Sequence, residues 1–170
     1  MRHVAALALS AAFILQTVMA FGQGSTSQSW DTRIDGPNRF VVLKDFNDQA
    51  VLDRETGLVW ERSPDPAPIA NWYGAYNTCL GKTIGGRWGW RLPAFEELAS
   101  LVATTSAIPT LPNQHPFNNV PGEFLTATTH LAAAPSFVLA INFGAHAIAR
   151  DKANPGRVWC VRGGRGFEGI

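Results

Sequence analysis

The side chains that could carry out acid–base, nucleophilic or metal chemistry are few in this sequence and widely spaced. Beyond residue 20 the histidines are His115, His130 and His146, and no cysteine or carboxylate stands near them at the spacing of a zinc site. Neither a G-x-S-x-G nor an H-E-x-x-H motif occurs. No catalytic triad or placed carboxylate pair can be read from the order of residues. We therefore expect a protein that is not an enzyme and that needs no metal and no other cofactor.

Two cysteines, Cys79 and Cys160, are the remaining reactive groups. Cysteines of exported proteins pair by default in an oxidising compartment, so one disulfide is predicted. Closing a loop of this length stabilises a fold by about 4–5 kcal/mol in the chain-entropy treatment. The alternative, a reactive thiol beside a histidine, requires one of the two cysteines to be free.

The first residues have the features of an export signal. Arg2 and His3 form a short basic region, residues 4–15 are apolar apart from one serine, and residues 18–20 have the small-residue pattern of a cleavage site. We read 1–20 as a signal peptide; the apolar run is shorter than the ~20 residues of a membrane span, although an uncleaved anchor is the alternative. The protein is then exported, to the periplasm or the cell exterior.

The rest of the chain divides into a short leader and one domain. Residues 21–38 are rich in Gly, Ser, Thr and Gln, which is typical of a flexible leader. Residues 39–165 are expected to form the folded domain, because a chain of this length and apolar content supports a single core.

Charge is balanced overall but unevenly distributed. Without residues 1–20 the chain carries 13 Lys and Arg against 13 Asp and Glu, which argues against nucleic-acid binding by phosphate neutralisation. Residues 21–70 carry a net charge of −3 and residues 140–170 a net charge of +3. We expect the two ends to pack together so that their charges offset; the alternative is a basic face for an anionic ligand.

Strands are predicted at both ends of the domain. Residues 39–43 read as a strand, and 50–52 with 58–62 as a hairpin in which Gly57 takes a positive φ. Four further runs, divided by glycine and Asn-Pro-Gly turns, have β character: 124–128, 136–143, 145–150 and 157–162.

Two short helices are predicted between these groups of strands. The first has a buried face that includes the first cysteine: Trp72, Tyr76, Cys79 and Leu80. The second begins at Pro93 and has the apolar stripe Phe95, Leu98, Leu101 and Val102. Residues 104–122 hold four prolines and are predicted to form a long loop. The arrangement is α+β.

Three local patterns, taken together and in order, resemble one family. Residues 51–60 read VLDRETGLVW; residues 88–93 read WGWRLP and are followed by Glu97-Leu98 and Leu101-Val102; residues 157–164 read RVWCVRGG. In these patterns the chain resembles the Lcl C-terminal-domain family of exported bacterial domains, which belongs to the C-type-lectin-like fold. The resemblance covers about residues 39–164.

This resemblance implies two short helices against a twisted antiparallel sheet, a long loop region, and both termini in one sheet. It also implies a disulfide from the first helix to the final strand, where Cys79 and Cys160 stand. Arg91 and Arg162 are expected to bond to carbonyl groups or to an acidic partner such as Asp53 or Glu97. The tryptophans are expected to determine the fold rather than to contact a ligand: Trp60, Trp72, Trp88, Trp90 and Trp159.

The resemblance to a lectin fold does not imply a calcium site in this chain. Calcium-dependent sugar-binding members of the broader fold use a Glu-Pro-Asn or Gln-Pro-Asp tripeptide and a Trp-Asn-Asp triplet, whose oxygens ligate the cation. Neither is present, and Leu111-Pro112-Asn113 lacks the first oxygen ligand. No metal is therefore expected at this loop.

The function expected is that of a non-enzymatic recognition module, binding a glycan, a glycosaminoglycan or a protein through its loop-rich face. The alternative is a structural or assembly component of a cell-envelope or surface apparatus. Loops carry binding sites on rigid scaffolds, so the candidate binding residues come from the loop regions. They are His115, Asn118, Asn119, His130, Asn142, His146, Arg150 and Lys152.

Overall fold

A computed structural model describes the chain over residues 34, 36–69, 71–103, 108–120, 122–130, 136–144 and 146–163. The predicted signal peptide, 1–20, and most of the predicted leader, 21–38, lie outside these residues. Across the described part of the chain, no helix has the length and apolar character needed to cross a membrane.

The first sheet joins the beginning of the domain to its end. Its strands are antiparallel in the order β1-β2-β3-β7: β1 is Phe40–Val42, β2 Ala50–Asp53, β3 Val59–Glu61 and β7 Val161–Arg162. The predicted hairpin is confirmed, and Gly57 in its turn has a φ of 72°. The last strand therefore closes a sheet that the first strands begin.

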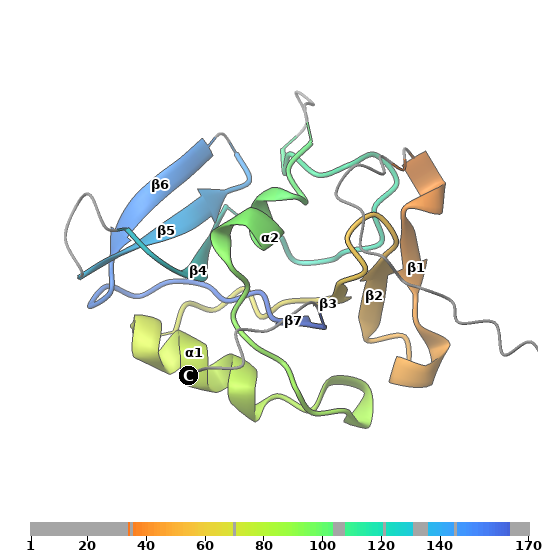
Figure 1. The fold of residues 1–170 in the computed structure, drawn as a ribbon, viewed down its shortest axis with the longest axis horizontal. Helices are drawn as coiled ribbons and strands as arrows, with labels where there is room; N and C mark the ends of the chain where they lie inside the picture. The colour runs from red at the N-terminus through yellow and green to blue at the C-terminus, as the bar shows by residue number, and fades with distance from the viewer. Residues whose placement is uncertain are drawn as a thin grey trace, which may run out of the picture.

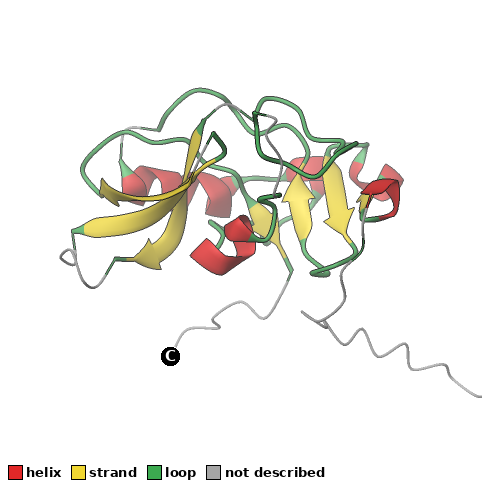
Figure 2. Ribbon diagram, turned by 90° about the horizontal axis from the view of Figure 1, so that it is seen from above, coloured by secondary structure: helices red, strands yellow, loops and turns green. Residues whose placement is uncertain are grey.

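A second antiparallel sheet follows the helices. It has the order β4-β5-β6, with β4 Glu123–Thr129, β5 Phe137–Asn142 and β6 His146–Asp151. The prediction of a single sheet is wrong: the two sheets lie towards opposite ends of the molecule, with the second helix between them (Figures 1 and 2). They are separate because β7 is only two residues long. The chain just before β7 instead bridges to the second sheet, where Arg157 pairs with Phe124.

Helix α1, Trp72–Gly81, runs along the lower left of the molecule in Figure 1. It begins where the side-chain oxygen of Asn71 accepts a hydrogen bond from the amide of Gly74. Its buried positions are Ala75 and Cys79, so the cysteine is on the buried face as predicted. The rest of the predicted face is wrong. Tyr76 and Leu80 are exposed and Trp72 is half-buried, because only the narrow strip formed by Ala75 and Cys79, one turn apart, faces the core.

Helix α2, Phe95–Ala99, is one turn long and begins two residues later than predicted. Pro93 precedes the helix instead of occupying its first position. The carboxylate of Glu97 accepts from the amide of Ala94, and this hydrogen bond fixes the start of the helix. Both leucines of the predicted stripe are buried, including Leu101 beyond the end of the helix, but Val102 is exposed.

Trp159 lies at the centre of the core. Its side chain is fully buried, its indole nitrogen donates to the carbonyl oxygen of Glu61 at 2.7 Å, and four rings surround it. The ring centroids lie between 4.9 and 5.7 Å from its own, and they belong to Trp60, Phe117, Phe124 and Phe143. Trp159 thus packs against residues from both sheets and from the 108–120 loop.

Of the tryptophans expected to determine the fold, one lies outside the core, and Trp72 is half-buried. Trp60, Trp90 and Trp159 are buried, whereas Trp88 is 67% exposed. Trp88 and Trp90 would face the same side of a regular strand, but Gly89 between them has a φ of 89° and breaks the alternation.

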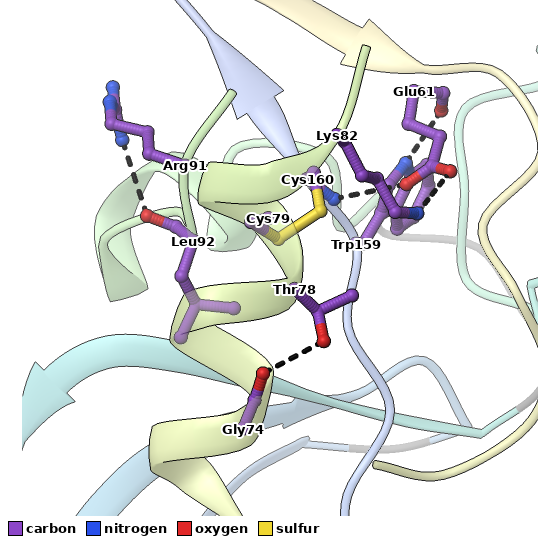
Figure 3. Close-up of a disulfide and its surroundings, with 9 residues drawn as sticks. All are labelled: Glu61, Gly74, Thr78, Cys79, Lys82, Arg91, Leu92, Trp159 and Cys160. Carbon is purple, nitrogen blue, oxygen red and sulfur yellow. Dashed lines mark hydrogen bonds and ion pairs between the residues drawn. A yellow bond between two sulfur atoms is a disulfide. The ribbon is translucent and has the colours of Figure 1, made fainter. Parts of the chain in front are cut away.

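The predicted disulfide is confirmed. Cys79 of α1 and Cys160, directly before β7, are bonded, and both are fully buried (Figure 3). The bond ties the middle of the chain to its last strand. A second cluster of buried side chains packs around it, including Trp90, Leu92 and Leu125.

Candidate functional site

The eight candidate binding residues fall into separate groups in the structure. His115, Asn118 and Asn119 lie in the 108–120 loop, which Arg62 fastens to the first sheet by donating to the carbonyl oxygen of Pro116. Asn119 donates to the hydroxyl of Ser63 and is otherwise exposed, as is Asn118.

His115 is the half-buried member of this loop group. Its Nδ1 accepts from the amide of Phe117 at 3.3 Å, and its ring stacks on the Phe117 ring. Burial lowers the pKa of His115 below its ordinary 6.5. The imidazole is therefore held in its neutral form in the fold.

Asn142, His146 and Arg150 belong to the β5–β6 hairpin of the second sheet. Asn142 and His146 face each other across the hairpin at its turn. The side-chain oxygen of Asn142 accepts from the amide of Gly144. Nε of Arg150 lies 2.7 Å from a carboxylate oxygen of Glu123, and the two groups form an ion pair. The Asn142 side chain thus stabilises the turn of the hairpin, and Arg150 links β6 to β4.

His130 and Lys152 lie at the other end of the hairpin. The amide of His130 donates to the carbonyl oxygen of Phe137. The ammonium of Lys152 donates to the Thr129 hydroxyl at 3.1 Å and lies 4.8 Å from the centre of the Trp72 ring. The structure does not bring the eight candidates together into one site.

The acidic beginning and the basic end of the domain pack together in the first sheet, where β3 pairs with β7. Among the described residues, no ion pair joins the acidic 21–70 region to the basic 140–170 region. Buried Asp53 pairs with Arg39 from its own sheet, and Glu61 pairs with Lys82. Arg157 donates to the carbonyl oxygen of Pro66. Of the described basic side chains near the end of the domain, Arg162 is the one that has no carboxylate, carbonyl or hydroxyl partner.

One surface gathers such unpaired charge. The guanidinium carbons of Arg87 and Arg162 lie 4.8 and 5.7 Å from the centre of the same ring, that of Phe46. Trp88, the next residue in the chain after Arg87, is exposed. We call the surface made of Phe46, Arg87, Trp88 and Arg162 the Phe46 patch.

A close backbone approach at Gly85 allows the patch to form. Phe46 ends a short 3-10 turn, Lys44–Phe46, which packs against a second one, Ile84–Gly86. In Figure 1 these are the orange turn and the yellow-green loop that meet at the lower right. A Cβ on Gly85 would lie 2.5 Å from the Cα of Phe46, so only glycine allows this approach. A Cβ on Gly89 would lie 3.6 Å from Nε of Arg162, which places that guanidinium against the turn.

The patch keeps a positive charge at its surface. Over the described residues, neither Arg87 nor Arg162 has a carboxylate within ion-pair distance. Arg87 reaches only the backbone carbonyl oxygen of Asp45, at 3.4 Å. The expected acidic or carbonyl partner is found for Arg91, which makes a two-pronged ion pair with Glu97, but not for Arg162, which rests on the Phe46 ring.

The sequence does not predict the patch, because its residues are far apart in the chain and because Trp88 is expected to help determine the fold. One local signal could have found it. A tryptophan between an arginine and a glycine, in a run of glycines, has few neighbours with which to be buried. Within the described part of the chain, no three His, Cys, Asp or Glu side chains come close enough to hold a metal ion.

A buried ion pair stands beside the disulfide, apart from the patch. Nζ of Lys82, at the end of α1, lies 2.5 Å from Oε1 of Glu61, and the amide of Cys160 donates to Oε2 (Figure 3). Burial raises the pKa of Glu61 above its ordinary 4.5, and Lys82 only partly reverses this. The pair holds α1 to the first sheet at the place where the disulfide does so.

Glu61 should therefore make stability depend on pH. Because the pKa of Glu61 is higher in the folded state than 4.5, the folded state holds the proton more tightly than the unfolded state. The free energy of unfolding therefore falls as the pH rises from 4.5 through the folded pKa. Well below 4.5 both states are protonated, and Glu61 then has no effect. Glu61→Gln removes this titration. Urea unfolding at a series of pH values should show the wild type losing stability relative to Glu61→Gln across that window. The control is Glu96→Gln, at an exposed glutamate. A pH-independent difference would contradict the assignment.

The fold and its surfaces define a small α+β domain of two antiparallel sheets, closed by one disulfide. The chain matches the Lcl C-terminal domain over residues 49–162, more than half of its length, and it belongs to that family. No curated protein and no solved structure is significantly similar to it.

Proposed function

We propose that this domain is a non-enzymatic recognition module and that it binds an anionic glycan through the Phe46 patch. One observation carries the proposal: two guanidinium groups lie over one ring without a carboxylate partner among the described residues. Guanidinium groups bind carboxylate and sulfate oxygens through paired hydrogen bonds. The ring of Phe46 limits the freedom of both groups before a ligand arrives, which lowers the cost of binding.

An acidic polysaccharide suits the remaining features of the patch. Trp88 presents a large exposed ring beside Arg87, and such a ring offers a surface on which the apolar face of a sugar can rest. Exposed side chains such as Arg87 and Trp88 fit repeated weak contacts along a polymer better than the enclosure of a small molecule.

The proposal also includes the compartment in which the domain acts and the fold to which it belongs. The disulfide suits an oxidising compartment, and we take the domain to act outside the cytoplasm. Its first and last strands share a sheet, and its first helix is bonded to the segment before the last strand, an arrangement that supports a C-type-lectin-like fold.

The expected result for Arg87→Ala with Arg162→Ala is an affinity for heparin about tenfold below that of the wild type, since each exposed charge contact contributes roughly 0.2–1 kcal/mol. The affinity should also fall less steeply with salt, because fewer counterions are released on binding. Titration calorimetry at two salt concentrations measures both effects, with uncharged dextran as the reference polymer.

Two variants serve as controls. Arg54→Ala removes an exposed arginine that lies outside the patch and only reaches the carbonyl oxygen of Asn38 at 3.4 Å, so it should leave binding unchanged. Lysine at both patch positions should retain part of the affinity, because the charge stays while the paired hydrogen bonds are lost. Heparin binding by the double alanine variant equal to that of the wild type would refute the patch.

A further inference from the structure

Helix α1 presents a second surface with a different chemistry. Tyr73, Tyr76 and Leu80 are 64%, 41% and 48% exposed. Positions three, four and seven apart lie on one face of a helix, so the three side chains form a stripe about 10 Å long. Asn77 is exposed on the same face. We call these four residues the α1 face.

The two tyrosine rings of the α1 face pack against Trp72. The Tyr76 ring stacks on Trp72 with centroids 5.8 Å apart, and Tyr73 meets Trp72 edge-on at 5.2 Å. The indole nitrogen of Trp72 donates to the carbonyl oxygen of Thr126 at 2.8 Å, which ties the ring to the second sheet. Lys152 lies over the Trp72 ring as well. The two tyrosines are therefore supported by a fixed indole.

The α1 face is uncharged. Helix α1 contains no Asp, Glu, Lys or Arg. The nearest described cation on this cluster, Lys152, is directed onto Trp72 and the Thr129 hydroxyl. What remains exposed is two rings with hydroxyl groups at their edges and an amide side chain. Such a surface complements a neutral ligand with both apolar faces and hydroxyl groups.

We propose that the α1 face is a second binding site, and that it takes a neutral oligosaccharide. One face of a pyranose ring presents C–H groups, which pack on the electron-rich face of an aromatic ring. Its hydroxyls can bond to the phenols of Tyr73 and Tyr76 and to the amide of Asn77. Tyrosines restrained by Trp72 lose little freedom on binding. The site needs neither Arg87 nor Arg162 and differs from the Phe46 patch in its insensitivity to salt.

The test uses the neutral hexasaccharides of cellulose, chitin and amylose, titrated at high salt, where binding at the Phe46 patch is screened. At least one should bind with an affinity that salt does not change, and should shift the ring resonances of Tyr73 and Tyr76 in NMR spectra. Tyr73→Ala should lower that affinity about tenfold. Tyr73→Phe should retain most of it, since the ring remains. Arg87→Ala with Arg162→Ala should have no effect, so the two sites can fail separately.

The control variant is Val102→Ala, which trims an exposed apolar side chain elsewhere. Binding of none of the three hexasaccharides, or equal binding by Tyr73→Ala, overturns the proposal. Sedimentation provides a further check. If the wild type self-associates and Tyr73→Ala does not, the α1 face is an interface between copies of the chain, and the proposal is wrong.

Discussion

Replacing Cys79 and Cys160 together by alanine is expected to lower the free energy of unfolding by about 4–5 kcal/mol. The bond closes a loop of 81 residues, so its loss frees the unfolded chain to adopt far more conformations. A domain of this size has a total stability of roughly 5–15 kcal/mol. The variant should therefore lose between about a third and nearly all of that stability. Urea unfolding of the oxidised wild type and of the variant measures the difference.

The contribution of the bond itself can be separated from that of the buried side chains. Wild-type protein unfolded with reductant keeps both cysteine side chains but lacks the bond, so it should have nearly the stability of the double alanine variant. Both sulfurs are buried, and reduction of the folded protein should be slow until it opens. Equal stability of the oxidised wild type and the variant would show that the bond adds nothing to the fold.

Local sequence patterns predicted most of the elements of this fold. The hairpin around Gly57 was readable because a glycine and a polar turn divide two apolar runs. The disulfide was predicted from two cysteines in a chain whose first residues have the pattern of an export signal. The sequence does not predict how residues 157–162 pair. The two residues of β7 join the first sheet, whereas Arg157 pairs with Phe124 of the second sheet, and tertiary packing determines this difference.

The candidate surfaces were harder to predict than the fold. An apolar period marks a helix face, but it does not say which neighbour covers that face. On α1 the sheet covers only the strip of Ala75 and Cys79, which leaves Tyr76 and Leu80 in solvent. In the same way, Arg162 was expected to pair with a carboxylate, and only the fold places it over Phe46. Arg150 and Lys152 have partners in Glu123 and Thr129 that sequence spacing does not indicate.

The core should be most sensitive to substitution at Trp159. Trp159→Ala is expected to lower the free energy of unfolding by about 3–5 kcal/mol, because it removes a fully buried ring and leaves a cavity among four others. It also leaves the carbonyl oxygen of Glu61 without the indole donor. Because this variant can fail to fold, Trp159→Phe is the second variant. It keeps part of the ring contact and should lose about 1–3 kcal/mol.

Trp88→Ala is the matched control, since it removes the same side chain from a position that is 67% exposed. Its stability should stay within about 0.5 kcal/mol of the wild type. If binding of heparin then falls while stability does not, Trp88 belongs to the Phe46 patch and not to the core. A large loss of stability in Trp88→Ala, or a small one in Trp159→Phe, would reverse these assignments. Chemical unfolding followed by far-ultraviolet circular dichroism suits all three variants, because tryptophan fluorescence changes with the substitutions themselves.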